Sequence, residues 1–169
     1  MKNVIGIDLG TTFSSVAVIF NNEITVVKDY LNEVSIPSVI NFQKVGSGIE
    51  VTVGNVAKKR QQMSPKMTVY DSKRMLGKSY GNDQIQKLKS NCTFNIEESE
   101  TGGILVSVDG VDKKYQPYEI SGEILKYLVD LANTRFPKEE QTNKVVIAIP
   151  ANFGDEQRTE TMKAASYAG

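Results

Sequence analysis

The sequence predicts an α/β protein whose main sheet draws on both ends of the chain. Three short apolar runs near the N-terminus have the length and turn spacing of neighbouring strands. Near the C-terminus, an apolar stripe at helical spacing precedes a continuous apolar run and a second helix. The segment between them is more polar and mixes short helices with a hairpin. We therefore expect one subdomain from residues 1–40 and 116–169, interrupted by an inserted α+β subdomain over residues 41–115.

The first stretch is expected to be an antiparallel meander of three strands. Its strand candidates are residues 4–7, 15–20 and 24–27. Residues 10–12 separate the first two candidates and residues 21–23 separate the last two, and both connections are rich in turn-forming residues.

Residues 5–14 place a carboxylate at a strand end, beside a turn that carries hydroxyl groups. Asp8 can supply a hard oxygen ligand to Mg²⁺ or to its waters. Gly10 can adopt a positive φ, while Thr11 and Thr12 offer backbone N–H groups and hydroxyls at the bend. These features are typical of a phosphate and metal site. They equally suit an ordinary β-hairpin, because Asp and Gly favour turns.

Composition excludes several classes of function. Among 169 residues, 20 Lys and Arg balance 20 Asp and Glu, so the chain has no strongly basic field to attract nucleic acid or an anionic membrane. The absence of histidine excludes a Ser-His-Asp or Cys-His nucleophile within this chain. The single cysteine, Cys92, cannot form an intrachain disulfide. With no apolar signal region and no bilayer-length span, the sequence predicts a cytoplasmic protein.

The inserted stretch is expected to hold three short helices and a hairpin. Proline, glycine and an Asn-Asp pair mark the helix boundaries, and a Gly-Gly turn joins the two strands. The helix candidates are residues 57–63, stopped near Pro65; residues 69–76, ended by Gly77; and residues 84–89, capped by Asn82 and Asp83. The strand candidates are residues 93–96 and 104–108.

The last stretch carries the strongest secondary-structure signals. Apolar residues recur at helical spacing from Ile120 to Leu131, and Pro117 stands where a first helical residue is tolerated. The continuous apolar run over residues 145–149 predicts a strand covered on both faces, and Pro150 ends it.

A final helix is expected from Asp155 to about Ala168, with Gly169 as its cap. Such a helix normally crosses over to a second parallel strand, and none follows here. A flat apolar strand left at a sheet edge would lack backbone partners on one side. We therefore expect this chain to be a fragment of a longer protein. The alternative is a natural terminus covered by a loop.

Four separated segments resemble the seventy-kilodalton heat-shock protein (DnaK-type) chaperone family. Their order and spacing match over nearly the whole chain, and four motifs in register are far more specific than one. The segments are Gly6-Ile7-Asp8-Leu9-Gly10-Thr11-Thr12-Phe13-Ser14, Ile36-Pro37-Ser38, Val69-Tyr70-Asp71-Ser72-Lys73-Arg74-Met75-Leu76-Gly77, and Val145 to Ala151 continuing to Phe153-Gly154-Asp155-Glu156-Gln157-Arg158. The resemblance implies lobe I of an actin-like ATPase domain. In that family this lobe is a ribonuclease-H-like sheet with an inserted subdomain, here truncated before its last strand.

The same resemblance implies a site for ATP or ADP and Mg²⁺. The residues of its first phosphate loop would be Gly10, Thr11, Thr12 and Phe13. Asp8 would help to hold Mg²⁺ through water. Lys73 would reach the terminal phosphate, where its charge can stabilise the transition state and help to place the attacking water. Taken without the flanking motif, Lys73 also suits a solvated surface lysine.

Pro150 and Arg158 match family positions that relay nucleotide state to the peptide-binding domain. Their simpler roles are strand terminator and exposed helix residue. Two positions depart from the family pattern: Asn152 precedes Phe153 where an aromatic pair is usual, and Val34 stands where a basic residue is frequent. These departures concern the expected interdomain contacts more than the phosphate site.

The implied function is therefore one lobe of the ATPase of a heat-shock chaperone. The implied partners are the second ATPase lobe, the peptide-binding domain, unfolded client peptides and J-domain co-chaperones, with no nucleic acid and no membrane. The family's second phosphate loop and adenine pocket would lie beyond residue 169, so we expect the chain alone to be inactive. The alternatives are a sugar-kinase-type member of the same superfold and a non-catalytic truncated paralogue that acts through protein contacts.

Overall fold

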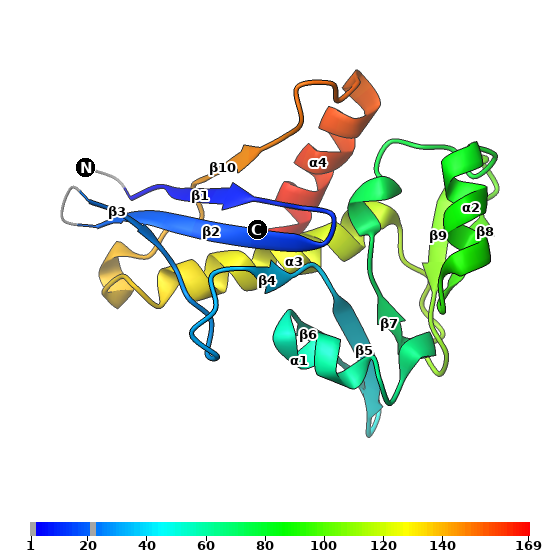
Figure 1. Ribbon diagram of the computed structural model, residues 1–169, viewed down its shortest axis with the longest axis horizontal. Helices are drawn as coiled ribbons and strands as arrows, with labels where there is room; N and C mark the ends of the chain where they lie inside the picture. The colour runs from blue at the N-terminus through cyan, green and yellow to red at the C-terminus, as the bar shows by residue number, and fades with distance from the viewer. Residues whose placement is uncertain (1–2, 21–22) are drawn as a thin grey trace.

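The computed structural model describes residues 3–20 and 23–169. Its central sheet has the strand order β10-β1-β2-β3, and a short strand β4 also pairs with β2. The strands are β1 (Ile5–Asp8), β2 (Phe13–Phe20), β3 (Glu23–Val26), β4 (Ile36–Pro37) and β10 (Val145–Ala148). The predicted antiparallel meander of β1, β2 and β3 is confirmed, and β10 adds a parallel neighbour to β1 (Figure 1). The predicted turn at 21–23 falls largely on residues 21–22, outside the described ranges.

Two helices, α3 (Pro117–Asn133) and α4 (Asp155–Ala168), cover one face of this sheet. The face is apolar because Ile5 and Ile7 of β1 and Val16 and Val18 of β2 are buried on the same side. Helix α3 packs on β1 and β2, and α4 packs along α3 (Figure 1). No helix within the described residues has both the length and the apolar character needed to cross a bilayer.

Strand β10 lies at the edge of the sheet, parallel to β1. The prediction that it is covered on both faces is wrong for the described chain. Val145 and Ile147 are half-buried on the side of the helices, whereas Val146 on the opposite side is 65 % exposed. The continuous apolar run therefore overstated the cover, because both described helices that pack on the sheet lie on one side of it.

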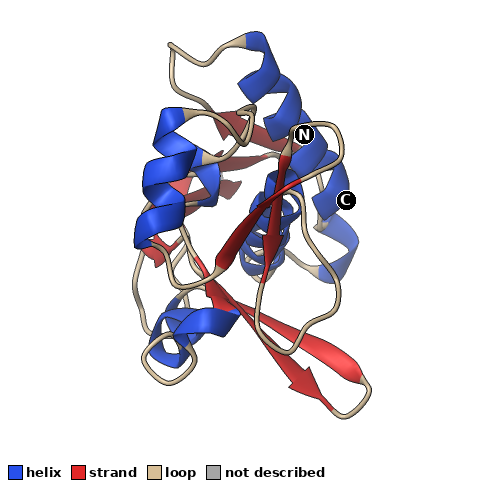
Figure 2. Cartoon of the chain, turned by 90° about the vertical axis from the view of Figure 1, so that its right-hand side faces the viewer, coloured by secondary structure: helices blue, strands red, loops and turns tan. Residues whose placement is uncertain are grey.

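The middle of the chain builds a three-stranded sheet of order β6-β5-β7 and a separate hairpin, β8–β9. These elements lie to one side of the central sheet (Figure 1), and Figure 2 views the chain from that side. Their bounds are β5 Ile40–Val45, β6 Gly48–Val53, α1 Asn55–Arg60, η1 Pro65–Met67, β7 Thr68–Val69, η2 Ser72–Arg74, α2 Asp83–Asn91, β8 Asn95–Glu98 and β9 Ile104–Ser107; a further 3-10 turn, η3, spans Lys138–Glu140. The division into residues 1–40 with 116–169 and residues 41–115 stays a prediction.

Most predicted elements of this segment are present with shifted ends. Helix α1 begins two residues before the predicted start and stops at Arg60, well short of Pro65. Helix α2 is confirmed with its cap, since Asn82 Oδ1 accepts a 3.0 Å hydrogen bond from the Gln84 N–H. The predicted hairpin is confirmed as β8–β9.

The helix predicted over residues 69–76 is wrong. The chain instead runs from the short strand β7 into the 3-10 turn η2, with Asp71 between them at φ 59°. A left-handed residue cannot belong to an α-helix, so the helical pattern is broken at its third position. Gly77 also has a positive φ, and a Cβ there would lie 2.5 Å from the Gln157 backbone nitrogen of α4. This segment follows its tertiary contacts rather than its local pattern.

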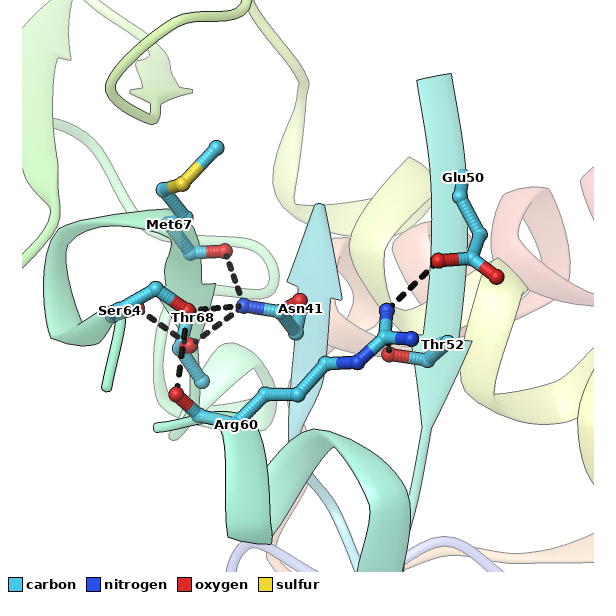
Figure 3. Close-up of polar contacts among 7 residues, drawn as sticks. All are labelled: Asn41, Glu50, Thr52, Arg60, Ser64, Met67 and Thr68. Carbon is cyan, nitrogen blue, oxygen red and sulfur yellow. Dashed lines mark hydrogen bonds and ion pairs between the residues drawn. The ribbon is translucent and has the colours of Figure 1, made fainter. Parts of the chain in front are cut away.

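A buried amide ties β5 to the end of α1 and to β7 (Figure 3). Asn41 Nδ2 donates to Thr68 Oγ1 at 2.9 Å, to Ser64 Oγ at 3.1 Å and to the Met67 carbonyl at 3.3 Å. Both hydroxyl protons are already committed, because Ser64 donates to the Arg60 carbonyl and Thr68 donates to the Ser64 carbonyl. The two hydroxyls must therefore accept from the amide, which fixes its orientation.

We expect Asn41→Ala to lower the free energy of unfolding by about 2 kcal/mol, because it removes the donor to the buried Thr68 hydroxyl and to two half-buried acceptors. Urea denaturation of the variant measures this loss. Glu50→Gln is the matched control, since it weakens the exposed 2.7 Å ion pair with Arg60 in the same region (Figure 3). That change should cost less than about 1 kcal/mol. Equal losses in the two variants would contradict the role of the buried amide.

Candidate functional site

The residues between β1 and β2 form an exposed loop at one end of the central sheet. Asp8 is the last residue of β1, and this residue is exposed to solvent. Thr12 is exposed, and the Phe13 side chain is 55 % exposed. The loop is also the turn of an antiparallel hairpin, so the hairpin and the phosphate-loop interpretations describe the same structure. Its exposed side, at Thr12 and Phe13, can be reached by a ligand.

Two buried serines hold this loop in shape. Ser38 Oγ donates to the Gly10 carbonyl at 2.8 Å and also hydrogen-bonds Ser14 Oγ at 2.8 Å. Ser14 Oγ in turn accepts from the Gly10 N–H at 3.2 Å, and the Ser38 N–H donates to the Thr12 carbonyl at 2.9 Å. Both serines are 2 % exposed. The loop is therefore fixed before any ligand arrives, which lowers the entropy lost on binding.

Sequence reasoning did not single out these serines as support for the loop. Ser38 follows β4, whose Pro37 pairs with Phe13 of β2. That pairing brings the segment after β4 against the loop from 28 residues away. No periodic pattern in the sequence marks such a contact, and only the family resemblance points to Ile36-Pro37-Ser38.

Lys73 reaches the same end of the sheet from η2. Its ammonium donates to the Leu9 carbonyl at 2.6 Å and lies 5.4 Å from the centre of the Phe153 ring. Burial lowers the pKa of Lys73 by desolvating the ammonium, and the Asp8 carboxylate opposes that shift. A lysine 64 residues away in sequence is thus placed beside the candidate phosphate loop.

The position of η2 is set by buried contacts on its other side. Ser72 Oγ hydrogen-bonds Ser121 Oγ of α3 at 3.1 Å, and both side chains are buried. Met75 and Leu76, which follow the turn, are fully buried. Lys73 is therefore attached to a rigid support although its own stem is flexible.

Pro150 and Arg158 lie on the connection from β10 to α4 and at the start of α4. The Phe153 N–H donates to the Pro150 carbonyl at 3.1 Å, and Arg158 Nε donates to the Phe153 carbonyl at 3.1 Å. Both predicted switch residues thus hydrogen-bond the backbone of Phe153, and the Lys73 ammonium lies over the ring of that residue. Among the described contacts, neither one hydrogen-bonds the loop itself.

The donor set suits a metal ion held mainly through water. The described residues contain no group of three or more His, Cys, Asp or Glu side chains placed to hold a metal. Asp8, with Thr11 and Thr12 beside it, offers one carboxylate and two hydroxyls at the loop. Mg²⁺ commonly keeps several waters and binds one or two carboxylates together with substrate phosphates. These residues therefore fit a water-mediated Mg²⁺ that arrives with a nucleotide.

A separate groove lies elsewhere on the surface. It has a volume of about 580 Å³ and runs between the turn of β8–β9, with Gly102 and Gly103, and the start of α4, with Asp155 and Glu156. Neither the loop nor Lys73 lines it. Asp155 and Glu156 occupy the first turn of α4, where carboxylates favour the helix dipole. We therefore identify the candidate site from the functional groups of the loop and not from the volume of this groove.

The comparisons with known proteins all indicate the same family. The family model described as "Hsp70 protein" matches residues 4–169. The "Chaperone protein DnaK" of Carsonella ruddii (strain PV) is 37 % identical over 169 residues, which cover 100 % of this chain and 27 % of the relative. The "Heat shock protein 70 homolog" of Acanthamoeba polyphaga mimivirus is 35 % identical over 176 residues, covering 99 % of this chain and 18 % of the relative. The chain thus spans roughly a quarter or less of the length of these curated relatives.

Proposed function

The chain belongs to the Hsp70 family, and we propose that it forms the first lobe of the ATP-binding and ATP-hydrolysing domain of a heat-shock molecular chaperone. The α/β fold, with a sheet that contains both parallel and antiparallel strands, agrees with the ribonuclease-H-like arrangement expected of an actin-like ATPase lobe. The proposal includes the partners that the resemblance implies: a second ATPase lobe, a peptide-binding domain, unfolded client peptides and J-domain co-chaperones.

The observation that carries the proposal is the 2.6 Å contact between the Lys73 ammonium and the Leu9 carbonyl. It places a positive charge beside Asp8 and the backbone of the loop, where the terminal phosphate of a nucleotide would lie. A neutral carbonyl is a weak partner for an ammonium, and a phosphate oxygen is a stronger one because both groups are charged. The half-buried cation therefore suits an anion delivered to this end of the sheet.

The proposed roles follow from this placement. Gly10 to Phe13 form the first phosphate loop, in which the hydroxyls and backbone N–H groups of Thr11 and Thr12 face the phosphates. The Gly10 N–H instead holds the loop in shape through Ser14 Oγ. Asp8 orients the waters of Mg²⁺, and the ion supplies charge neutralisation when bound. Lys73 stabilises charge that develops on the terminal phosphate. Phosphoryl transfer depends chiefly on such positioning and electrostatics, so no histidine is required.

Pro150 and Arg158 are proposed as the relay between the nucleotide and the peptide-binding domain. Each hydrogen-bonds the backbone of Phe153, and the Lys73 ammonium lies over the Phe153 ring. A movement of Lys73 toward a phosphate would therefore change the contacts of this turn. Arg158 is exposed and so remains accessible to another domain. This arrangement supports the relay without requiring either residue to touch the nucleotide.

Isothermal titration calorimetry with MgATP tests the proposed function. The full-length protein that contains this chain should bind with a dissociation constant in the micromolar range or below, about −8 kcal/mol or stronger, and should hydrolyse the ATP. Residues 1–169 alone should show no saturable binding, because a single lobe cannot enclose the base or exclude water. Absence of binding and hydrolysis by the full-length protein would contradict the ATPase assignment. A micromolar dissociation constant for residues 1–169 would contradict only the expectation that one lobe cannot bind ATP by itself.

A further inference from the structure

We propose that Phe153 is a positioning residue that holds the Lys73 ammonium at the phosphate side of the cleft. This inference rests on the proposed function, because it assigns Phe153 a part in orienting the lysine of that site. The aromatic face attracts a cation electrostatically, and a ring centroid within about 6 Å of the ammonium is the geometry that such an attraction needs. The observed separation is 5.4 Å.

Lys73 needs this second contact because its stem is long and only partly confined. The side chain is half-buried, and its one hydrogen bond among the described residues goes to the Leu9 carbonyl. A single bond leaves the four-carbon stem free to pivot about that oxygen. The ring of Phe153 adds a second attraction from a different part of the chain, so two contacts fix the position of the ammonium instead of one.

Phe153 is itself held in place by its backbone. Its N–H donates to the Pro150 carbonyl, and its carbonyl accepts from Arg158 Nε, both at 3.1 Å. These bonds clamp the turn between β10 and α4 from both sides. The neighbouring residue, Asn152, is exposed and carries no aromatic ring. Phe153 is therefore the side chain of this turn that can offer a ring to Lys73.

The two contacts predict how the pair behaves when ATP binds. A phosphate oxygen replaces the Leu9 carbonyl as the partner of the ammonium, while the ring keeps the ammonium from swinging into solvent. Loss of the ring should therefore affect the hydrolytic step more than the affinity for ATP, because the bound nucleotide is still held by the loop and the second lobe.

Nuclear magnetic resonance of the full-length protein, with lysines labelled as ¹³C-dimethyl-lysine, tests the contact without nucleotide. The Lys73 signal, assigned by its loss in Lys73→Arg, should lie upfield of an exposed lysine because of the ring current. Phe153→Leu should remove that shift, Phe153→Tyr should retain it and Phe153→Trp should enlarge it. Tyr80→Leu is the matched control, because it removes the 4.9 Å ring contact of Lys89 far from the site and should leave Lys73 unchanged.

Single-turnover hydrolysis tests the consequence. Phe153→Leu should lower the rate about fivefold, the loss expected for one cation–π contact, with the dissociation constant for ATP within about twofold of the parent. Phe153→Tyr should restore the rate. If the Lys73 signal ignores the ring in the Leu, Tyr and Trp series, the positioning role is overturned; the Tyr and Trp variants keep this test available should Phe153→Leu fail to fold. If the signal follows the ring but the parent hydrolyses no ATP, the contact is upheld and the ATPase function is overturned.

Discussion

Replacement of Lys73 by alanine should lower the single-turnover rate of ATP hydrolysis about a hundred- to a thousandfold, the loss typical of removing one preorganised transition-state donor. The ammonium lies 2.6 Å from the Leu9 carbonyl and beside the loop that is proposed to hold the phosphates. Its half-burial lowers its pKa by desolvation, which indicates that the protein shields this charge in part from water. Rapid mixing of the full-length protein with labelled ATP measures the rate.

Lys66→Ala is the matched control for this change. Lys66 is 71 % exposed and forms a 3.8 Å pair with Asp109, well away from the loop. Its loss should leave hydrolysis unchanged, because an exposed pair of this kind contributes little. Lys73→Arg should not restore the rate, since a planar guanidinium does not occupy the position of a compact ammonium. Unchanged turnover in Lys73→Ala would refute the catalytic role and favour a non-catalytic paralogue.

The sequence predicted the central sheet well because its signals there are local. The meander of β1, β2 and β3 has short connections and apolar runs of strand length, and both features act between neighbouring residues. Helix α3 was equally clear, since its buried stripe and its first-turn Pro117 are visible in the sequence alone.

The sequence failed where tertiary contacts decide the local structure. The segment before Gly77 has helical spacing, yet Asp71 adopts a positive φ and Ser72 is held by Ser121 of α3. The exposed face of β10 was missed for a related reason. An apolar run indicates that a strand packs against other elements, but it does not tell whether one face or both faces are covered.

The candidate site shows the same division between local and distant information. Asp8 and the loop could be proposed from ten neighbouring residues, although those residues equally predicted a hairpin, and the structure contains that hairpin. The loop's support by Ser38 and its approach by Lys73 depend on contacts across 28 and 64 residues. Only a family resemblance or a structure could bring these residues together.

Gly10→Ala should weaken MgATP binding by the full-length protein at least about a hundredfold, or about 3 kcal/mol. A Cβ at position 10 would lie 1.9 Å from the Phe13 carbonyl oxygen and 3.1 Å from its carbon. These are backbone atoms at the start of β2, so they cannot turn aside as a flexible side chain could. The loop would have to open, and this change of loop conformation would break the hydrogen bond from Ser38 to the Gly10 carbonyl.

Gly81→Ala separates this steric effect from the general cost of replacing glycine. A Cβ at position 81 meets no atom within 4 Å, so that variant should bind ATP normally. Calorimetry on the two variants, with thermal unfolding to confirm that both are folded, makes the comparison. Normal affinity in Gly10→Ala would mean that the loop can relax without losing its ligand, which contradicts a rigid phosphate loop. A loss confined to Gly10→Ala would instead show that nucleotide affinity depends on the close approach of the loop backbone to Phe13, because in both variants the added atoms are the same single methyl group.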